Sequence, residues 1–417
     1  MSTHRLPISI REQTRLIVSI LSLLYGWIVC LIGKMFFFIS GHRINNHDLN
    51  LAELKDILII HIGKIGDAIL LTPFLRELKD NIPNARITIC TNFLTQSLFS
   101  HSPYITRILI FDKKEKILNL LLPPFQSVLF AYNNFRKYHF DLAIVPRWDL
   151  DMTNSAFLAY LSGAQFRIGY SEKVTIEKSY YNKGYDRFYT HTLDDRLKQH
   201  SVKQFLNIIS YIGGNINNES LELWSSPTDD KIYKKICSDI KSPIVVFCPG
   251  ADEAKRMWPV KNYIEIGEWL SKNYDCKIAV IGGRKEMVLG KVIKNVLKDC
   301  AINYVNKFTL DKLGSFLKNC CLYIGSDTGA MHIAAAAGVP VVEISCHPLS
   351  GCPMSPNAPE RVSPWTSKRF IFQPQNPKKP CKDSCISSKP HCITMIRAED
   401  VKDIIKTHAS EFKLHKK

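Results

Sequence analysis

Short apolar runs rich in β-branched residues recur along most of the chain, and each is followed by a longer stretch with helical spacing. The runs cover residues 57–62, 86–90, 108–111 and 142–145 in the first half, and 244–248, 277–281, 322–324 and 339–344 in the second. Runs of this length that alternate with helices are typical of parallel strands wrapped by helices. The sequence therefore predicts an α/β protein with two doubly wound, Rossmann-like domains.

A polar stretch at residues 215–243 separates the two groups of runs and marks the expected domain boundary. We predict an N-terminal domain over residues 46–225 and a C-terminal domain over residues 226–400. Two such domains normally face each other across a cleft lined by the carboxyl ends of their strands, so ligands are expected there. Residues 1–45 and 401–417 are predicted to lie outside both domains, as a membrane-anchor segment and a basic C-terminal tail.

The N-terminal segment holds 18 uncharged, mostly apolar residues between Arg15 and Lys34. As a helix they would extend about 27 Å, close to the thickness of a bilayer core. We expect an apolar, membrane-associated helix, with a helix buried against the globular part as the alternative. Basic residues flank both ends, so the orientation stays open, as does the choice between spanning the membrane and lying on it. The expected location is the cytoplasmic face of the inner membrane.

The charge balance indicates an anionic partner, because 55 Lys and Arg stand against 38 Asp and Glu. Residues 361–417 alone carry 13 basic and 5 acidic side chains, which favours contact with an anionic membrane surface. A basic and aromatic motif of a known nucleic-acid binder is missing from the sequence, so nucleic acid is not an expected partner.

The 13 cysteines are odd in number and scattered, as in a reduced protein without a disulfide framework. Cys381, Cys385 and Cys392 form a group with His391, but their spacing is irregular for zinc ligands. We expect ordinary thiols, with a structural metal as the alternative and the role of the group left open.

The segment "IGSDTGAMHIAAAAGVP" (residues 324–340) carries the sharpest chemical signal. It reads as a strand, a turn and a helix, and the free N–H groups at such a helix start bind phosphate. We predict that a donor substrate carrying a diphosphate binds here, through Asp327, Thr328, Gly329 and His332. The Thr328 hydroxyl and the His332 ring would complete a diphosphate cradle. The alternatives are helix capping by Asp327 and Thr328 and a purely structural role for His332.

Two other strand ends are expected to reach the same cleft. In "CPGADEAKRMWP" (residues 248–259), Lys255 and Arg256 could neutralise a leaving diphosphate, unless they lie in a solvated loop. In "VIGGRKE" (residues 280–286), Glu286 could accept hydrogen bonds from ribose hydroxyls, unless it is an ordinary surface charge.

These segments, together with the tail "PCKDSCISSKPHCITMIRAEDV" and a G-x-x-G-D loop that ends at Asp67, resemble glycosyltransferase family 9, the lipopolysaccharide heptosyltransferases, over about residues 54–401. The resemblance implies a GT-B fold, an ADP-heptose donor in the C-terminal half, an acceptor in the N-terminal half and no metal or cofactor. The chain departs from the family at one point: Arg256 stands where such enzymes usually carry a lysine. Because arginine binds phosphate with a different geometry, another ADP-sugar is an open alternative.

The loop "HIGKIGDAILLTP" (residues 61–73) places an acid where a phosphate-binding loop would avoid one. If the diphosphate binds on the other domain, Asp67 can act as the general base on an acceptor hydroxyl, in an inverting single displacement. The alternative role of Asp67 is helix capping. Gly66 is expected to keep the approach of the acceptor hydroxyl open. If Asp67 is not the base, Asp149 and Asp151 are the reserve acids. Lys64 and Arg147 are the predicted acceptor-binding residues.

The expected function is heptose transfer from ADP-heptose to an anionic glycolipid, either a lipopolysaccharide core or a related lipid-linked glycan. The rival outside enzymology is a non-catalytic, membrane-bound glycan-binding protein. A dinucleotide-dependent oxidoreductase is disfavoured, because neither glycine loop has the G-x-G-x-x-G spacing. The sequence leaves open the exact sugar, its position on the acceptor and the oligomeric state.

Overall fold

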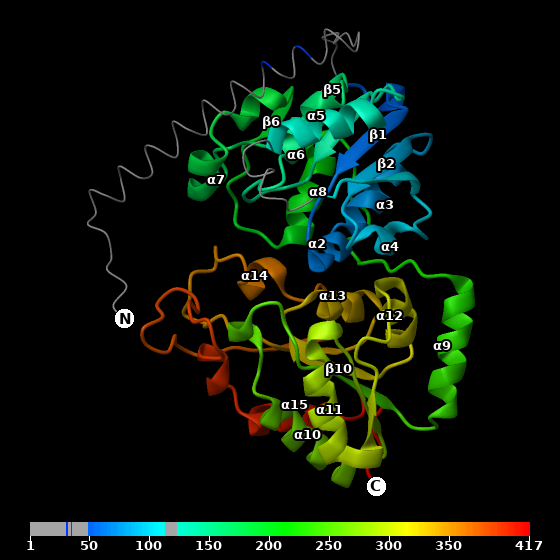
Figure 1. Ribbon diagram of the computed structural model, residues 1–417, viewed down its shortest axis with the longest axis vertical. Coiled ribbons are helices and arrows are strands. Elements are labelled where there is room, and N and C mark those ends of the chain that lie inside the picture. Colours follow the sequence, from blue (N-terminus) through cyan, green and yellow to red (C-terminus); the bar gives the residue numbers. More distant parts are fainter. Residues whose placement is uncertain (1–30, 32–34, 36–48, 113–122) are drawn as a thin grey trace.

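The computed structural model describes residues 31, 35, 49–112 and 123–417, and it contains two six-stranded parallel sheets, one above the other in Figure 1. The first has the order β3-β2-β1-β4-β5-β6 and the second the order β12-β11-β10-β7-β8-β9. The strands of the first sheet are β1 (Asp56–Ile60), β2 (Arg86–Thr91), β3 (Ile105–Ile110), β4 (Leu142–Val145), β5 (Phe166–Tyr170) and β6 (His191–Leu193). Those of the second are β7 (Ile244–Cys248), β8 (Lys277–Val280), β9 (Ala301–Asn303), β10 (Leu322–Ser326), β11 (Val341–Ile344) and β12 (Arg369–Phe372).

The strand order reverses between β1 and β4 in the first sheet, and between β10 and β7 in the second. The loops that leave adjacent strands at such a switch point diverge, which opens a crevice at the carboxyl ends of the strands. Asp67, Arg147, Arg256 and Asp327 all follow these four strands in sequence. The topology therefore brings the predicted site residues toward the junction of the two halves.

Helices connect the strands in both halves. In the first half they are α2 (Ile65–Leu70), α3 (Thr72–Asn81), α4 (Gln96–Phe99), α5 (Pro123–Asn134), α6 (Ser155–Leu161), α7 (Ile176–Tyr181) and α8 (Ser201–Tyr211). In the second they are α9 (Pro227–Asp239), α10 (Val260–Asn273), α11 (Met287–Leu297), α12 (Leu310–Leu317), α13 (Gly329–Ala336), α14 (Pro359–Val362) and α15 (Ala398–Thr407). Short 3-10 turns include η4 (Ala254–Arg256), η5 (Arg284–Glu286) and η7 (Cys392–Met395).

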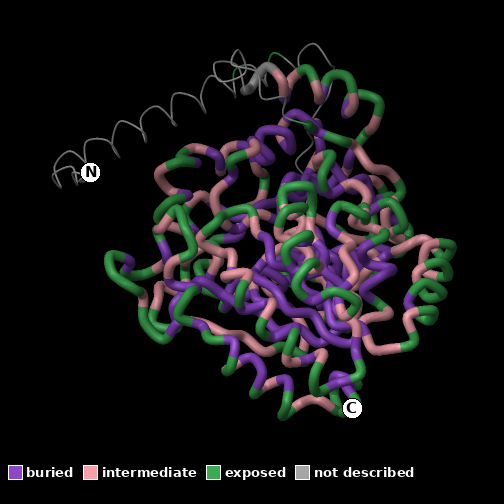
Figure 2. Tube along the Cα trace, turned by 60° about the horizontal axis from the view of Figure 1, so that its bottom comes forward, coloured by how far each residue is buried: buried purple, intermediate pink, exposed green. Residues whose placement is uncertain are grey.

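The central strands β4 and β7 are apolar along their whole length because helices cover both faces of each sheet. All residues of β4 and β7 are buried, and Figure 2 shows the buried backbone gathered in the interior with exposed segments around it. The chain passes from the first sheet to the second between Leu193 and Ile244, and the boundary predicted between residues 225 and 226 falls within this stretch.

The two halves touch where the start of α2 meets the start of α13, at the junction visible in Figure 1. A Cβ atom on Gly66 would lie 2.6 Å from His332 Cδ2, and one on Gly329 would lie 2.5 Å from Ile65 Cβ. Glycine at both positions therefore permits a backbone approach that no other residue would allow. His332 occupies the space beside Gly66, and the expectation that this glycine keeps the approach to Asp67 open stays a prediction.

The segment expected to be a separate basic tail packs onto the second domain instead. Val401 and Ile405 on α15, followed by Phe412 and Leu414, are buried in the apolar cluster that surrounds β7, β8 and β10. These apolar residues share one face of the segment, while the lysines at 406, 413, 416 and 417 are exposed. The prediction of a separate tail was based on the charge of the segment and overlooked the helical spacing of its apolar side chains.

The apolar run between Arg15 and Lys34, predicted to be a membrane-associated helix, lies outside the described residues apart from Leu31. Within residues 49–112 and 123–417, no helix combines the length and the hydropathy that a membrane crossing requires.

Candidate active site

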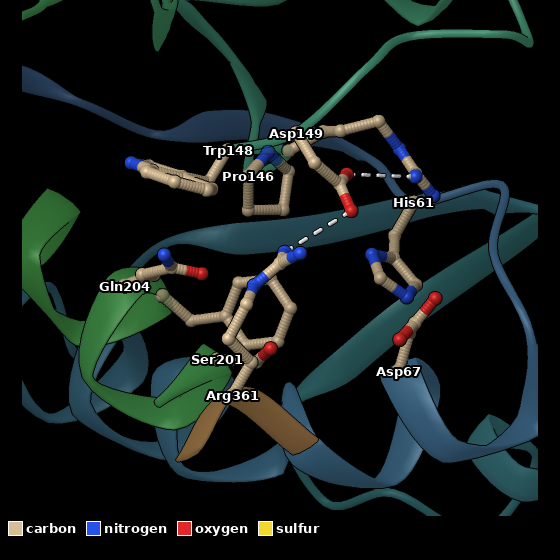
Figure 3. Close-up of a pocket in the computed structure, with 10 residues that line it drawn as sticks. His61, Asp67, Pro146, Trp148, Asp149, Ser201, Gln204 and Arg361 are labelled. Carbon is tan, nitrogen blue, oxygen red and sulfur yellow. Dashed lines mark hydrogen bonds and ion pairs between the residues drawn. The ribbon is translucent and has the colours of Figure 1, made fainter. Parts of the chain in front are cut away.

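A cavity at the carboxyl ends of β1 and β4 encloses about 330 Å³ of empty space, including its open mouth. Most of its wall comes from the first domain, and Arg361 on α14 of the second domain completes it (Figure 3). The lining residues are His61, Asp67, Pro146, Arg147, Trp148, Asp149, Ser201, Gln204, Phe205 and Arg361. The predicted base and the predicted acceptor ligand Arg147 thus share one cavity, whereas Lys64 is exposed beside it.

Asp67 occupies the first turn of α2, where its Oδ2 accepts a long hydrogen bond of 3.4 Å from the backbone N–H of Lys64. This contact is the helix-capping role considered above, and it leaves most of the carboxylate's acceptor capacity unused. Burial raises the pKa of Asp67, although the nearby Arg147 guanidinium lowers it. Among the described residues no cation forms an ion pair with Asp67, so this carboxylate is poised to accept a proton.

His61 is a second polar group at the floor of the cavity, and sequence reasoning assigned it no role. Its ring and the Asp67 carboxylate point toward each other in Figure 3. Burial lowers the pKa of His61 to about 3, so the ring is neutral. Its buried Nε2 has no hydrogen-bond partner within the described part of the chain. The only sequence signal was a histidine at the end of an apolar strand, which is more often a packed core residue.

Asp149 is held by one arginine from each domain. Its Oδ1 lies 3.2 Å from Nη1 of Arg147, and its Oδ2 lies 3.3 Å from Nη2 of Arg361, with the Arg361 guanidinium 5.2 Å from the ring centre of Trp148. Burial would raise the pKa of Asp149, but Arg147 and Arg361 outweigh it and keep the pKa below its usual value. Asp149 is therefore an ionised clamp between the domains and a poor proton acceptor.

Asp151, the other reserve acid, is committed to local structure. Its carboxylate accepts hydrogen bonds from the backbone N–H groups of Thr153, Ser155 and Ala156, at 2.9 to 3.1 Å, where α6 begins. Lys178 fixes the preceding loop by donating to the carbonyl oxygens of Arg147 and Trp148, at 2.9 and 3.3 Å. Of the three acids considered as bases, only Asp67 has a carboxylate free of strong partners.

The predicted donor residues form the adjoining edge of the second domain. Asp327 is buried, and its Oδ2 lies 2.8 Å from Nη2 of Arg256, which also donates to the Asp327 carbonyl. Thr328 is the N-cap of α13 but makes no side-chain capping bond, and its hydroxyl lies 3.3 Å from that of Tyr323. Burial lowers the pKa of His332 to about 3, so its ring is a neutral hydrogen-bonding group.

The two edges face each other where α2 meets α13. Burial raises the pKa of Asp327, Arg256 and Lys64 lower it, and Asp67 raises it again from across the junction. The predicted base therefore lies within electrostatic range of the predicted diphosphate cradle, although the two residues come from different domains.

Two predicted donor residues have local partners in this structure. Lys255 pairs with Glu253 at 2.7 Å, so Arg256 is the more deeply placed of the two cations. The Oε2 of Glu286 accepts a 2.8 Å hydrogen bond from the backbone of Gly283, at the start of η5. A Cβ on Gly250 would lie 2.1 Å from Cγ of Glu286, which shows that this side chain lies against the loop after β7.

Sequence reasoning also missed Glu343, a buried acid on β11. Its Oε2 has no hydrogen-bond partner among the described residues, and burial together with Asp327 raises its pKa well above the usual value. The signal was present as a single acid inside the apolar strand "VVEIS". The raised pKa favours the neutral form of Glu343, which would oppose an anionic ligand less than a carboxylate would.

The fold is a two-domain α/β architecture of the GT-B type, in which two Rossmann-like halves face each other. The family model described as glycosyltransferase family 9 (heptosyltransferase) matches residues 132–391. The chain therefore belongs to glycosyltransferase family 9 and is an enzyme of that family.

Known relatives agree with this assignment. Lipooligosaccharide heptosyltransferase 2 of Haemophilus influenzae is 30% identical over 138 residues, which cover 31% of this chain and 36% of that protein. Lipooligosaccharide heptosyltransferase 2 of Campylobacter jejuni is 23% identical over 82% of this chain and 95% of its own.

Solved structures show the same fold. The family 9 glycosyltransferase of Veillonella parvula superposes with a TM-score of 0.69 at 20% identity, covering 88% of this chain and 99% of its own. The E. coli heptosyltransferase WaaC, solved with ADP, gives a TM-score of 0.62 at 14% identity, covering 84% of this chain and 99% of its own.

Proposed function

We propose that the protein transfers heptose from ADP-heptose to the core of lipopolysaccharide or to a related lipid-linked glycan, with inversion at the anomeric carbon. The observation that carries the proposal is the placement of Asp67, a carboxylate free of any ion pair with the described residues, opposite the start of α13. The names of the relatives, which are heptosyltransferases of lipopolysaccharide and lipooligosaccharide, support the choice of sugar and acceptor.

In this mechanism the acceptor hydroxyl lies in the cavity beside Asp67 and Arg147. Asp67 takes the hydroxyl proton as the oxygen attacks the anomeric carbon from the face opposite the diphosphate. The bond from that carbon to the phosphate oxygen breaks, and ADP leaves with the electron pair. The acceptor oxygen thus replaces the diphosphate on the opposite face of the sugar, which inverts the configuration.

The leaving diphosphate would be held at the start of α13, where backbone N–H groups and the Thr328 hydroxyl would donate hydrogen bonds to it. Arg256 would supply positive charge by a bidentate contact, and neutral His332 would supply an N–H donor. Both side chains stand beside this helix start and carry buried nitrogens without a hydrogen-bond partner in the described residues, Nε of Arg256 and Nδ1 of His332. The proposal needs no cofactor, because the ADP-sugar is a co-substrate.

Another ADP-linked sugar is the second candidate donor, favoured only by Arg256 at the family's lysine position. The two donors are distinguished by mass spectrometry of the glycolipid from cells that lack the protein. We expect a glycolipid lighter by one heptose residue, restored when the gene is returned. Loss of a hexose mass would favour the second candidate, and an unchanged glycolipid would contradict both.

We also propose that the protein works at the cytoplasmic face of the inner membrane. Deleting residues 1–43 should release it from membranes without unfolding the enzyme, because the described globular part begins at residue 49. Residual binding at low salt should come from exposed C-terminal lysines, including Lys413 and Lys417, and disappear as salt screens them. Vesicle sedimentation with circular dichroism measures both effects, and an aggregated, unfolded truncation would show instead that the apolar segment belongs to the core.

A further inference from the structure

Three cysteines and one histidine converge in the segment between β12 and α15. The ligand atoms of Cys381, Cys385, His391 and Cys392 all lie within 4.8 Å of one another. The three cysteines are buried and His391 is half-buried, and all three thiols are free. Their spacing along the chain is irregular, but the fold brings the four side chains together, with His391 and Cys392 at the start of η7.

Two distances from His391 within this Cys-His cluster match those between ligands of one tetrahedral ion. Nδ1 of His391 lies 3.5 Å from Sγ of Cys381 and 3.6 Å from Sγ of Cys392. Zinc bonds of about 2.3 Å to sulfur and 2.0 to 2.1 Å to nitrogen imply tetrahedral edges of roughly 3.5 to 3.8 Å. The backbone N–H of Ile386 also points at Sγ of Cys381, at 3.5 Å, a contact that would stabilise a bound thiolate.

We propose that the Cys-His cluster binds one zinc ion through three thiolates and Nδ1 of His391. Thiolate and imidazole ligands in tetrahedral geometry select zinc among the common divalent ions. Four protein ligands leave no open coordination position, so the ion is structural and takes no part in the transfer reaction. This inference differs from the sequence-based expectation of ordinary thiols and is independent of the proposed donor and acceptor.

The surroundings explain what the ion would stabilise. Residues 373–391 contain no helix or strand and few apolar side chains, so they cannot form a core of their own. Beyond the cluster, the carbonyl of Ile396 accepts a 3.0 Å hydrogen bond from Nε1 of Trp258, next to the turn that carries Arg256. The carbonyl of Asp383 accepts a 2.7 Å hydrogen bond from the backbone N–H of Cys352, in the loop that leads to Arg361. The zinc ion would thus fix the segment against which both arginine-bearing loops pack.

Elemental analysis of the full-length protein, purified without metal-affinity chromatography and without a tag, tests the proposal. We expect about one zinc per chain, as for a closed structural site. The double variant Cys381→Ser/Cys392→Ser should lose the zinc. The matched control Cys320→Ser changes a half-buried thiol far from the cluster in the sequence and should retain it.

A second measurement uses only the wild-type chain, in case the double variant does not fold. The protein stripped of metal by a chelator should melt at a lower temperature, and added Co²⁺ should produce the visible bands of tetrahedral cobalt with thiolate charge transfer. A wild-type protein that contains no zinc and binds neither ion would overturn the proposal. So would an intact mass lower by two hydrogen atoms, which indicates that two thiols of the cluster have been oxidised to a disulfide. Iron in place of zinc would overturn the choice of ion.

Discussion

Replacing Asp67 with asparagine should lower turnover by about 100-fold or more, the usual contribution of a positioned general base. Asparagine keeps the size of the side chain and can still accept the 3.4 Å hydrogen bond from the backbone of Lys64. It cannot take a proton from the acceptor hydroxyl. Fold and ADP affinity should change little, because the proposed diphosphate site lies on the other domain.

Turnover and melting temperature, measured together, separate the two roles of Asp67. If it were only a helix cap, the substitution would cost little in either quantity, since asparagine caps about as well as aspartate. Asp239→Asn, at an exposed position on the last turn of α9, is the matched control and should alter neither. Near-normal turnover of Asp67→Asn would contradict the mechanism, and the ion pairs of Asp149 make that residue a poor replacement.

The pH dependence of kcat/KM offers an independent check on the base. A general base must be deprotonated, and burial raises the pKa of Asp67. The rate should therefore fall as the pH drops through a value above the ordinary aspartate pKa of about 3.9. In Asp67→Asn this acid limb should be absent from the residual rate.

Replacing Arg256 with alanine should weaken ADP binding by about 10- to 100-fold, the expected cost of losing a charge-assisted contact to phosphate. The loss also leaves Asp327 buried without its 2.8 Å partner, so the melting temperature should fall as well. Arg256→Lys should recover part of the affinity, because lysine keeps the charge but not the bidentate geometry. Isothermal titration calorimetry measures the ADP affinity of the wild type, Arg256→Ala and Arg256→Lys.

Lys255→Ala is the matched control for this series. Lys255 neighbours Arg256 and carries the same charge, but it pairs with Glu253 rather than with the start of α13. We expect its substitution to change ADP affinity much less. An equal loss in Lys255→Ala would show that net charge, rather than the position of Arg256, determines binding, and unchanged affinity in Arg256→Ala would remove this residue from the donor site.

The central strands could be predicted from sequence because burial on both faces makes them continuously apolar. β4 and β7 have the bounds predicted for them. β5 escaped prediction because its run contains Arg167 and Gly169. The guanidinium of Arg167 is buried but satisfied by the carbonyls of Phe188 and Ala164, at 2.8 and 2.7 Å, and Gly169 makes room for the ring of Tyr189. Such compensation depends on segments distant in sequence, so local pattern cannot show it.

Some residues of the candidate site could likewise be predicted from sequence, and others could not. Asp327 and Thr328 directly follow β10, and Asp67 lies in the first turn of the helix after β1. Because parallel topology places strand ends at one edge, the sequence was sufficient to group them. Arg361 pairs with Asp149 from 212 residues away, through a short helix with no motif of its own. Its role depends on how the two domains pack, which no local pattern specifies. The predicted ligand roles themselves stay predictions until the variants are measured.

The proposed base and the proposed diphosphate cradle lie on different domains. These domains meet where Gly66 contacts His332 and Gly329 contacts Ile65. In the proposed mechanism, an ADP-sugar held by the second domain meets the proposed base, Asp67, only through the first domain. The proposed transfer would therefore require the two halves to be joined at this contact, as they are in this structure.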